Sequence, residues 1–313
     1  MSGSASSGAG LLKAKLYIMA GALLFSTGGA AIKLSTLSGW QLSCFRSLAA
    51  GIALLLLSPA ARGNWTWRSL LVAVPYATTF TLFTLANKLT TAANAIFLQD
   101  TAPFYILLLS PLLLGERIRR VDIGFMAALV IGLGLIFASS REPTVNAANP
   151  ELGNVLAACA GLSWALTVLG LRWLAVRAGS HAESPLSAVV MGCFLAFAIG
   201  GWFGLPVESS SIQDWLIVVY LGIFQIALAY LFITAGVRHV PAFEASLLLL
   251  VEPVFSPVWV WLLLEELPGA LALTGGALVI VATAIYAGLQ GRDSAELAAK
   301  NGARPPVLDV ESR

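Results

Sequence analysis

Charge is scarce in this 313-residue chain. Charged residues make up 11% of it and hydrophobic residues 58%, and the mean hydropathy is +0.86. A water-soluble protein of this length would need far more charge on its surface. The composition therefore excludes an ordinary pair of soluble domains and indicates an integral membrane protein. A net charge of only +2 also gives no general attraction for nucleic acid.

Cysteine and histidine are rare as well. Cys44, Cys159 and Cys193 lie in apolar stretches without a metal-ligand spacing, and neither His181 nor His239 has a nearby cysteine or second histidine. These patterns exclude a disulfide framework and a zinc site, and we expect no metal and no cofactor. The H-E-x-x-H, G-x-S-x-G and P-loop patterns are missing too. We therefore do not expect an enzyme or an ATP-driven pump.

Long apolar runs fill the sequence instead. A membrane-spanning helix needs roughly 17–25 mostly apolar residues, and ten such stretches follow one another with short connections. They are residues 15–32, 41–58, 69–87, 92–114, 121–139, 153–176, 184–205, 214–235, 243–264 and 269–289. We predict an all-α integral membrane protein with ten transmembrane helices, between flexible tails at residues 1–12 and 291–313.

Lysine and arginine are unevenly distributed around these spans. If alternate connections lie on one side, fourteen of these residues share that side and only Lys33, Lys88 and Arg141 lie on the other. Cytoplasmic flanks accumulate lysine and arginine. The asymmetry therefore predicts a multi-pass protein of the plasma membrane with both termini in the cytoplasm.

The sequence also contains an internal repeat. A shift of 150 residues aligns NAIFLQDTAPFYILLLSPLLLGE with EASLLLLVEPVFSPVWVWLLLEE, so that Pro103 meets Pro253 and Glu116 meets Glu266. Each half, 13–145 and 146–290, contains five spans. Because five is odd, the second half enters the membrane from the opposite side, which predicts two inverted five-helix repeats. Inverted repeats are common in secondary transporters and favour alternating access.

With these residues in view, the chain resembles the EamA family of the drug/metabolite transporter superfamily. The resemblance rests on the ten-helix repeat, on Arg46 in LSCFRSLAAGIALLLL, on Pro103 and Leu114-Gly115-Glu116, and on the matching Pro253 and Glu266. Within that family the chain is most similar to the YddG-type exporters of aromatic amino acids. The resemblance implies a bacterial inner-membrane exporter. One departure is Glu265, which replaces the glycine before the second glutamate.

Three charged side chains, Arg46, Asp100 and Glu252, lie well inside the predicted spans, away from their ends. An arginine at a helix centre costs about 2.5–3.5 kcal/mol on insertion scales, so such groups normally face a cavity or a partner. Arg46 either pairs with a carboxylate or with helix-end carbonyls, or it meets a substrate carboxylate. Asp100 and Glu252 either pair, stay protonated in the interior, or couple transport to protons.

Pro103 and Pro253 interrupt the fourth and ninth spans at equivalent positions. Proline removes a helix hydrogen bond and frees carbonyls that need partners in the protein or in a cavity. Paired interruptions of this kind point to a binding site at the midplane. We therefore interpret the two prolines as hinges, with simple kinks as the alternative.

Aromatic and polar side chains at a similar depth are candidates for the wall of that site. The predicted substrate-binding residues are Tyr76, Thr79, Phe80, Phe97, Gln99, Trp164 and Phe224. Aromatic rings with a few polar groups suit an amphiphilic organic solute. A single aromatic ring in a membrane helix is, however, more often a packing residue.

The function predicted from these patterns is secondary transport, most simply export, of small metabolites. The resemblance narrows this to amino acids, with aromatic side chains favoured. Phosphate-bearing solutes are disfavoured, because they would require several buried lysines or arginines and Arg46 is the one cation well inside a span. A drug or organic-cation/proton antiporter and a passive channel remain alternatives. The expected partners are a small-molecule substrate and the lipid bilayer, and we expect a monomer.

Overall fold

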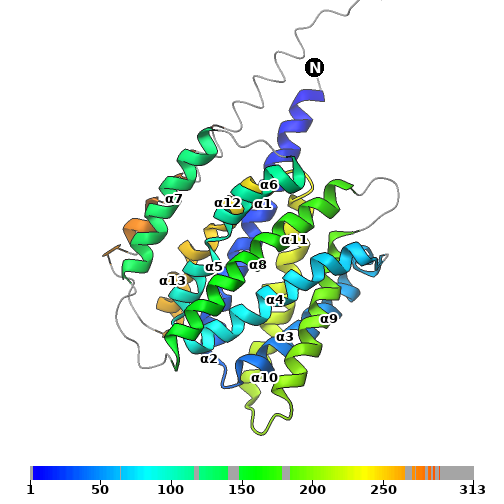
Figure 1. The fold of residues 1–313 in the computed structure, drawn as a ribbon, viewed down its shortest axis with the longest axis vertical. Helices are drawn as coiled ribbons and strands as arrows, with labels where there is room; N and C mark the ends of the chain where they lie inside the picture. Colours follow the sequence, from blue (N-terminus) through cyan, green and yellow to red (C-terminus); the bar gives the residue numbers. More distant parts are fainter. Residues whose placement is uncertain are drawn as a thin grey trace, which may run out of the picture.

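A computed structural model describes residues 3–63, 65–115, 120–139, 148–177 and 184–264, and scattered helical positions between 270 and 289. Over these residues the chain is helical with short connections and contains no strand. The helices form one elongated bundle (Figure 1). Several residues highlighted by the sequence, namely Glu116, Arg141, Glu265 and Glu266 and the tail 291–313, lie outside the described residues.

The first half contributes eight helical elements. They are α1 (Gly3–Ser26), α2 (Gly28–Leu34), α3 (Gly39–Leu57), the 3-10 turn η1 (Pro59–Arg62), α4 (Trp67–Leu89), α5 (Ala92–Gln99), α6 (Ala102–Leu114) and α7 (Arg120–Ser139). Helix α1 begins inside the segment 1–12 that was expected to be a flexible tail. Adding residues to an existing helix is far easier than nucleating one, so the following span extends into its flank.

The second half contributes seven elements. They are α8 (Pro150–Arg177), α9 (Pro185–Gly204), α10 (Ile212–Tyr220), η2 (Leu221–Leu228), α11 (Ala229–Gly236), α12 (Ala242–Leu249) and α13 (Val251–Leu264). The element η2 is a π-helix, and it joins α10 to α11 without a break.

Seven helical stretches of the described residues are long and apolar enough to cross a membrane. They are Gly10–Leu34, Gly39–Leu57, Trp67–Leu89, Asn94–Leu114, Pro150–Val176, Pro185–Gly204 and Ile212–Gly236. These coincide with predicted spans one to four and six to eight. The fifth and ninth predicted spans correspond to α7 and to α12–α13. The prediction of a multi-pass helical membrane protein is confirmed, whereas the count of ten helices stays a prediction.

Local sequence signals set several helix ends. Ser38 and Gln41 form a reciprocal capping box at the start of α3, and Ser211 and Asp214 form another at the start of α10. Helix α6 ends at Gly115, whose φ of 68° lies in the left-handed region that glycine adopts without steric cost.

The helix contacts that the first half makes with the second are matched by equivalent contacts that the second half makes with the first. Helix α8 packs on α4, α5 and α6, and α1 correspondingly packs on α11, α12 and α13. Helix α9 packs on α4, while α3 packs on η2; α3 and α9, which are equivalent, also pack on each other. Helix α7 lies at the edge of the bundle (Figure 1). The elements that surround the bundle centre are therefore α1, α4, α5, α8, η2 and α13.

Candidate functional site

Two helix breaks lie opposite each other near the bundle centre. Helix α5 ends at Gln99 and α6 begins at Ala102, one residue before Pro103. Helix α12 ends at Leu249 and α13 begins at Val251, two residues before Pro253. The shift of 150 residues relates the two breaks, and proline explains both because it cannot donate the next helix hydrogen bond. The hinge role of Pro103 and Pro253 stays a prediction.

Close packing brings other elements against the first break. A Cβ at Gly161 of α8 would lie 2.7 Å from the carbonyl oxygen of Leu98 and 2.9 Å from that of Gln99. Only glycine permits this approach. Helix α5 also packs on α13, and α6 packs on α12, so the two broken helices cross near their breaks.

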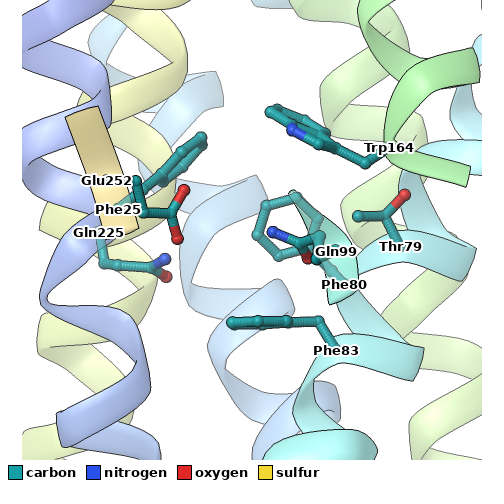
Figure 2. A pocket seen from close by; sticks show the side chains of 8 residues that line it. All are labelled: Phe25, Thr79, Phe80, Phe83, Gln99, Trp164, Gln225 and Glu252. Atoms are coloured by element: carbon teal, nitrogen blue, oxygen red, sulfur yellow. The ribbon is translucent and has the colours of Figure 1, made fainter. Parts of the chain in front are cut away.

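A small cavity lies beside these breaks. Six elements from both halves line it, with the side chains of Phe25, Thr79, Phe80, Phe83, Gln99, Trp164, Gln225 and Glu252 (Figure 2). The space between these atoms, including the open side, is about 290 Å³. Much of that space is open, and the enclosed part holds little more than a water-sized molecule, so a solute of amino-acid size requires the walls to move apart.

The structure brings together five of the residues that the sequence selected. Thr79, Phe80, Gln99 and Trp164 line the cavity, and so does Glu252, which the sequence selected as a coupling or structural charge. Their exposed fractions are all small, with Gln99 at 6% and Trp164 and Glu252 at 5%. Residues from α4, α5, α8 and α13 thus meet at one place.

The other three predicted binding residues lie elsewhere. Tyr76 is buried behind Phe80, with 4.7 Å between their stacked ring centroids, and its hydroxyl lies 3.2 Å from Sγ of Cys193. Phe97 packs against the apolar core and is not among the lining residues. Phe224 is 47% exposed on the outer side of η2, where its ring stacks on that of Tyr220.

An aromatic cluster forms the wall of the cavity. The Phe25 ring contacts those of Phe80, Trp164 and Tyr230, with centroids 6.2, 6.0 and 5.5 Å away. Phe80 and Tyr230 also contact each other, at 5.8 Å. These two residues are related by the shift of 150 residues.

Arg46 of α3 is fully buried but does not line the cavity. Its Nη2 donates a hydrogen bond of 2.8 Å to the Phe80 carbonyl oxygen, and its guanidinium carbon lies 5.3 Å from the Phe80 ring centroid. Among the described residues no carboxylate lies within 4.0 Å of it. This geometry favours the interpretation of Arg46 as an anchor that joins α3 to α4. The carbonyl that it contacts, that of Phe80, lies inside a helix and not at a helix end.

Asp100 lies at the break between α5 and α6. Its side chain is 6% exposed, and its buried Oδ2 has no hydrogen-bond partner. The Asp100 and Glu252 carboxyl groups are close enough to interact electrostatically. Asp100 and Glu252, one from each half, thus place one acid at each of the two breaks.

Sequence reasoning missed three lining residues, Phe25, Phe83 and Gln225, and it missed Tyr230 in the wall. Gln225 carried a usable signal, because an amide within a long apolar span needs a polar partner or a cavity. The three aromatic residues carried none that separates them from ordinary packing residues.

Charged side chains fasten the two ends of the bundle. Lys15 of α1 and Glu244 of α12 form an ion pair of 2.7 Å, and both are nearly buried. At the opposite end Asp214 accepts hydrogen bonds from Ser35, Thr36 and Ser211 at 2.6–2.9 Å. These contacts join the first half to the second at both ends of the cavity-lining helices.

Metal binding finds no support in the described part of the chain. No group of three or more His, Cys, Asp or Glu side chains there could hold a metal ion. Asp100 and Glu252 thus form a pair without a third ligand of these types.

A polar and aromatic cavity between apolar spanning helices, lined by three elements from each half, is typical of helical membrane transporters. Comparison with protein families agrees: the model of the EamA-like transporter family matches residues 12–138 and again residues 151–288. The chain belongs to this family. The separate matches coincide with the two halves of the internal repeat. Membership in a transporter family also supports the expectation that the chain is not an enzyme.

Curated relatives are consistent with this assignment. The chain is 28% identical to the pseudopaline exporter CntI of Pseudomonas aeruginosa over 192 residues, which are 61% of this chain and 64% of that one. It is also 28% identical to a chloroplastic WAT1-related protein of Arabidopsis thaliana over 277 residues, 80% of this chain and 63% of that one. In both cases the match spans less than two thirds of the relative's length.

A solved structure shares the fold. One crystal structure matches with a TM-score of 0.71 at 20% identity, and the match covers 87% of this chain and 97% of the other. At this level of identity the likeness shows the fold alone. Together the comparisons show a multi-pass membrane protein of a transporter family.

Proposed function

We propose that the chain is a secondary exporter of small amphiphilic metabolites that works by alternating access between two inverted five-helix repeats. The observation that carries the proposal is the cavity itself. Three lining elements come from each half: α1 and α8 are repeat equivalents, α4 and η2 are repeat equivalents, and α5 and α13 belong to the two broken helices that the repeat relates. A site shared by inverted halves can face either side of a bilayer in turn.

Contacts between equivalent residues support the inverted arrangement. Phe80 and Tyr230 are repeat mates and their rings touch, as do the equivalent helices α3 and α9. Equivalent groups contact each other directly only beside a two-fold axis. The repeats would occupy residues 13–145 and 146–290, with Pro103 and Pro253 as their hinges.

Amino acids with aromatic side chains are the substrates that we favour. Phe25, Phe80, Phe83 and Trp164 offer apolar and aromatic surface, while Gln99, Thr79 and the carboxyl group of Glu252 offer polar groups. No lysine or arginine is among the lining residues, which disfavours phosphate-bearing solutes. The exporter CntI supports the coarser proposal of metabolite export, and its bacterial origin supports placement in an inner membrane.

Counterflow in liposomes tests the proposal. The purified chain is reconstituted, the lumen is loaded with unlabelled tryptophan, and uptake of labelled tryptophan is followed. A carrier accelerates labelled uptake when the opposite side is loaded, whereas an open channel does not. Acceleration is expected; equal uptake with and without loading would favour a channel and contradict alternating access.

An organic-cation/proton antiporter is the second candidate, because Glu252 lines the cavity and Asp100 lies near it. If these carboxyl groups carry protons, Glu252→Gln and Asp100→Asn abolish the pH dependence of transport while ligand binding persists. Uptake of labelled tetraphenylphosphonium against an imposed pH gradient distinguishes this candidate from an amino acid exporter. Unchanged pH dependence in both variants would remove the two acids from proton coupling.

A further inference from the structure

The polar end of the cavity is formed by Glu252 and Gln225. Figure 2 shows their side chains on one side, opposite Gln99 and Trp164. Glu252 lies in the first turn of α13 and Gln225 lies within η2. Both side chains are more than nine-tenths buried, with exposed fractions of 5% and 4%. We propose that Glu252 and Gln225 form a subsite for the positively charged ammonium group of the transported solute.

Charge balance is the first argument. Glu252 is the one ionisable residue among the described residues that line the cavity, and no cationic side chain of the described chain lies within 4.0 Å of its carboxylate. Asp100 adds a second acid nearby. A buried carboxylate is costly unless a proton or a cation neutralises it. An ammonium group entering the cavity would supply that cation.

Arg46 is a buried arginine, but it does not line the cavity. The Arg46 guanidinium lies beyond Phe80 and hydrogen-bonds to a backbone carbonyl, so it does not neutralise the cavity. An anionic solute would therefore meet carboxyl groups with no lining lysine or arginine to offset the repulsion.

Hydrogen-bond capacity is the second argument. The buried Oε1 of Gln225 has no hydrogen-bond partner, although the side chain lines the cavity. An unpaired buried acceptor is unfavourable and calls for a donor. An ammonium group carries three N–H donors and no acceptor, whereas a carboxylate accepts only. Gln225 and Glu252 together present the acceptors that such a group requires.

The aromatic wall suits the same ligand. Phe25 lies on the same side of the cavity as Glu252, and Trp164 and Phe80 lie across from it (Figure 2). A cation near an aromatic face is stabilised by the ring electrons, and more strongly when the cation is desolvated. The rings also cover the apolar body of the solute. An aromatic or otherwise amphiphilic amine combines both features.

The backbone supports the position of Gln225 in two ways. Gln225 lies in a π-helical segment, and such segments are rare and occur often at functional sites. Gly28 of α2 faces it: a Cβ at residue 28 would lie 2.8 Å from Nε2 of Gln225. A methyl group there would displace the flexible end of that side chain and leave the helix backbone in place.

This subsite rests on the proposed transport function, because it names the chemical class that the same cavity accepts. Binding and transport can nevertheless be separated. Ligand binding to the purified full chain measures the subsite directly, and liposome transport measures the function.

The test compares four aromatic probes of similar size that differ in charge. Phenethylamine is cationic, phenylalanine zwitterionic, phenethyl alcohol neutral and hydrocinnamate anionic. Binding to the full chain in detergent is measured by isothermal titration. We expect phenethylamine to bind more tightly than the alcohol and hydrocinnamate by about tenfold or more, with phenylalanine in between, because charge-assisted hydrogen bonds are the stronger kind.

Variants assign that preference to the two side chains. Glu252→Gln is expected to raise the Kd for phenethylamine about tenfold or more and to leave the Kd for the alcohol nearly unchanged. Gln225→Ala and Gly28→Ala are expected to weaken amine binding severalfold. Glu208→Gln and Gln213→Ala, the same types of change at exposed positions, serve as matched controls and are expected to leave every Kd unchanged. Thermal unfolding confirms that each variant is folded.

Three outcomes overturn the subsite. They are equal or tighter binding of hydrocinnamate or the alcohol by the native chain, no binding of phenethylamine, or an amine preference that survives Glu252→Gln and both Gln225→Ala and Gly28→Ala. If one variant fails to fold, the others still decide. Amine binding without counterflow would instead contradict the proposed function and leave the subsite standing.

Discussion

Gly161 illustrates how a single missing side chain shapes the site. Its Cα faces the carbonyl oxygens of Leu98 and Gln99; Pro103 cannot donate to the Gln99 carbonyl, whereas the Leu98 carbonyl accepts a hydrogen bond from the Thr101 hydroxyl. The absence of a Cβ lets α8 approach the break between α5 and α6. Trp164, three residues further along α8, then reaches the cavity. The position of one cavity wall therefore depends on this glycine.

Gly161→Ala is expected to lower the thermal stability of the protein. The new methyl group would lie 2.7 Å from backbone atoms that cannot rotate away, and overpacking of this kind costs about 1–3 kcal/mol. Thermal unfolding in detergent measures the effect. Gly124→Ala, at a position with nothing within 4 Å of the added Cβ, is the control. Equal melting temperatures for the two variants would show that α8 can move aside.

Trp164→Ala is expected to reduce uptake of aromatic amino acids by roughly two- to tenfold, since an aromatic contact contributes about 0.5–1.5 kcal/mol beyond its area. Trp65→Ala removes the same side chain at a half-exposed position away from the cavity and is expected to have little effect. Uptake per amount of reconstituted protein is the measurement. Equal losses would remove Trp164 from the binding site.

At the scale of elements, the broken helices are the feature most directly tied to transport. The breaks α5–α6 and α12–α13 follow from prolines at repeat-related positions, and each exposes a polar side chain beside the cavity. Helix pairs at the two ends are fastened differently, by the Lys15–Glu244 ion pair at one end and by hydrogen bonds to Asp214 at the other. Opening one side of the cavity requires the contacts at that end to separate.

Pro103→Ala and Pro253→Ala are expected to slow transport by roughly fivefold or more without abolishing ligand binding. Alanine restores a backbone N–H and removes the ring that clashes with the preceding turn, so the helices can close across the break. Pro111→Ala is the matched control, because Pro111 lies inside α6 at an exposed position where the helix continues. Initial counterflow rates decide, and rates equal to those of the control would exclude a hinge role.

Lys15→Met and Glu244→Met are each expected to lower the melting temperature, because each leaves a buried charge without its partner. The cost is typically about 3–5 kcal/mol, and replacing both partners by apolar groups is often nearly neutral. The double variant is therefore expected to recover much of the loss. Lys13→Met, at an exposed neighbour, controls for loss of positive charge. Additive losses in the double variant would show that the two residues do not act as a pair.

At the scale of the whole molecule, the proposed pseudo-symmetry organises the fold. The repeat exchanges the packing of α8 on α4, α5 and α6 with that of α1 on α11, α12 and α13. Such exchange is what two similar halves of opposite orientation require. The family model matches the two halves separately, which agrees with this division.

Topology mapping tests the inverted arrangement. Reporter tags are placed after each predicted span, and their accessibility is read in intact cells. We expect both termini in the cytoplasm and opposite orientations for the halves 13–145 and 146–290, because lysine and arginine concentrate on one side. Halves that run in the same direction would contradict the inverted repeat and the transport mechanism built on it.

Sequence alone determined the class of the protein, because long apolar runs with little charge have few stable solutions outside a bilayer. It also located the helix breaks, since proline acts on its own turn, and it selected Thr79, Phe80, Gln99, Trp164 and Glu252. Tertiary structure decided the rest. Phe224 points outward and Gln225 inward because successive residues of a helix project in different directions around its axis. Only packing between distant segments fixes that rotation, and it places Arg46 behind Phe80 and Glu252 at the cavity.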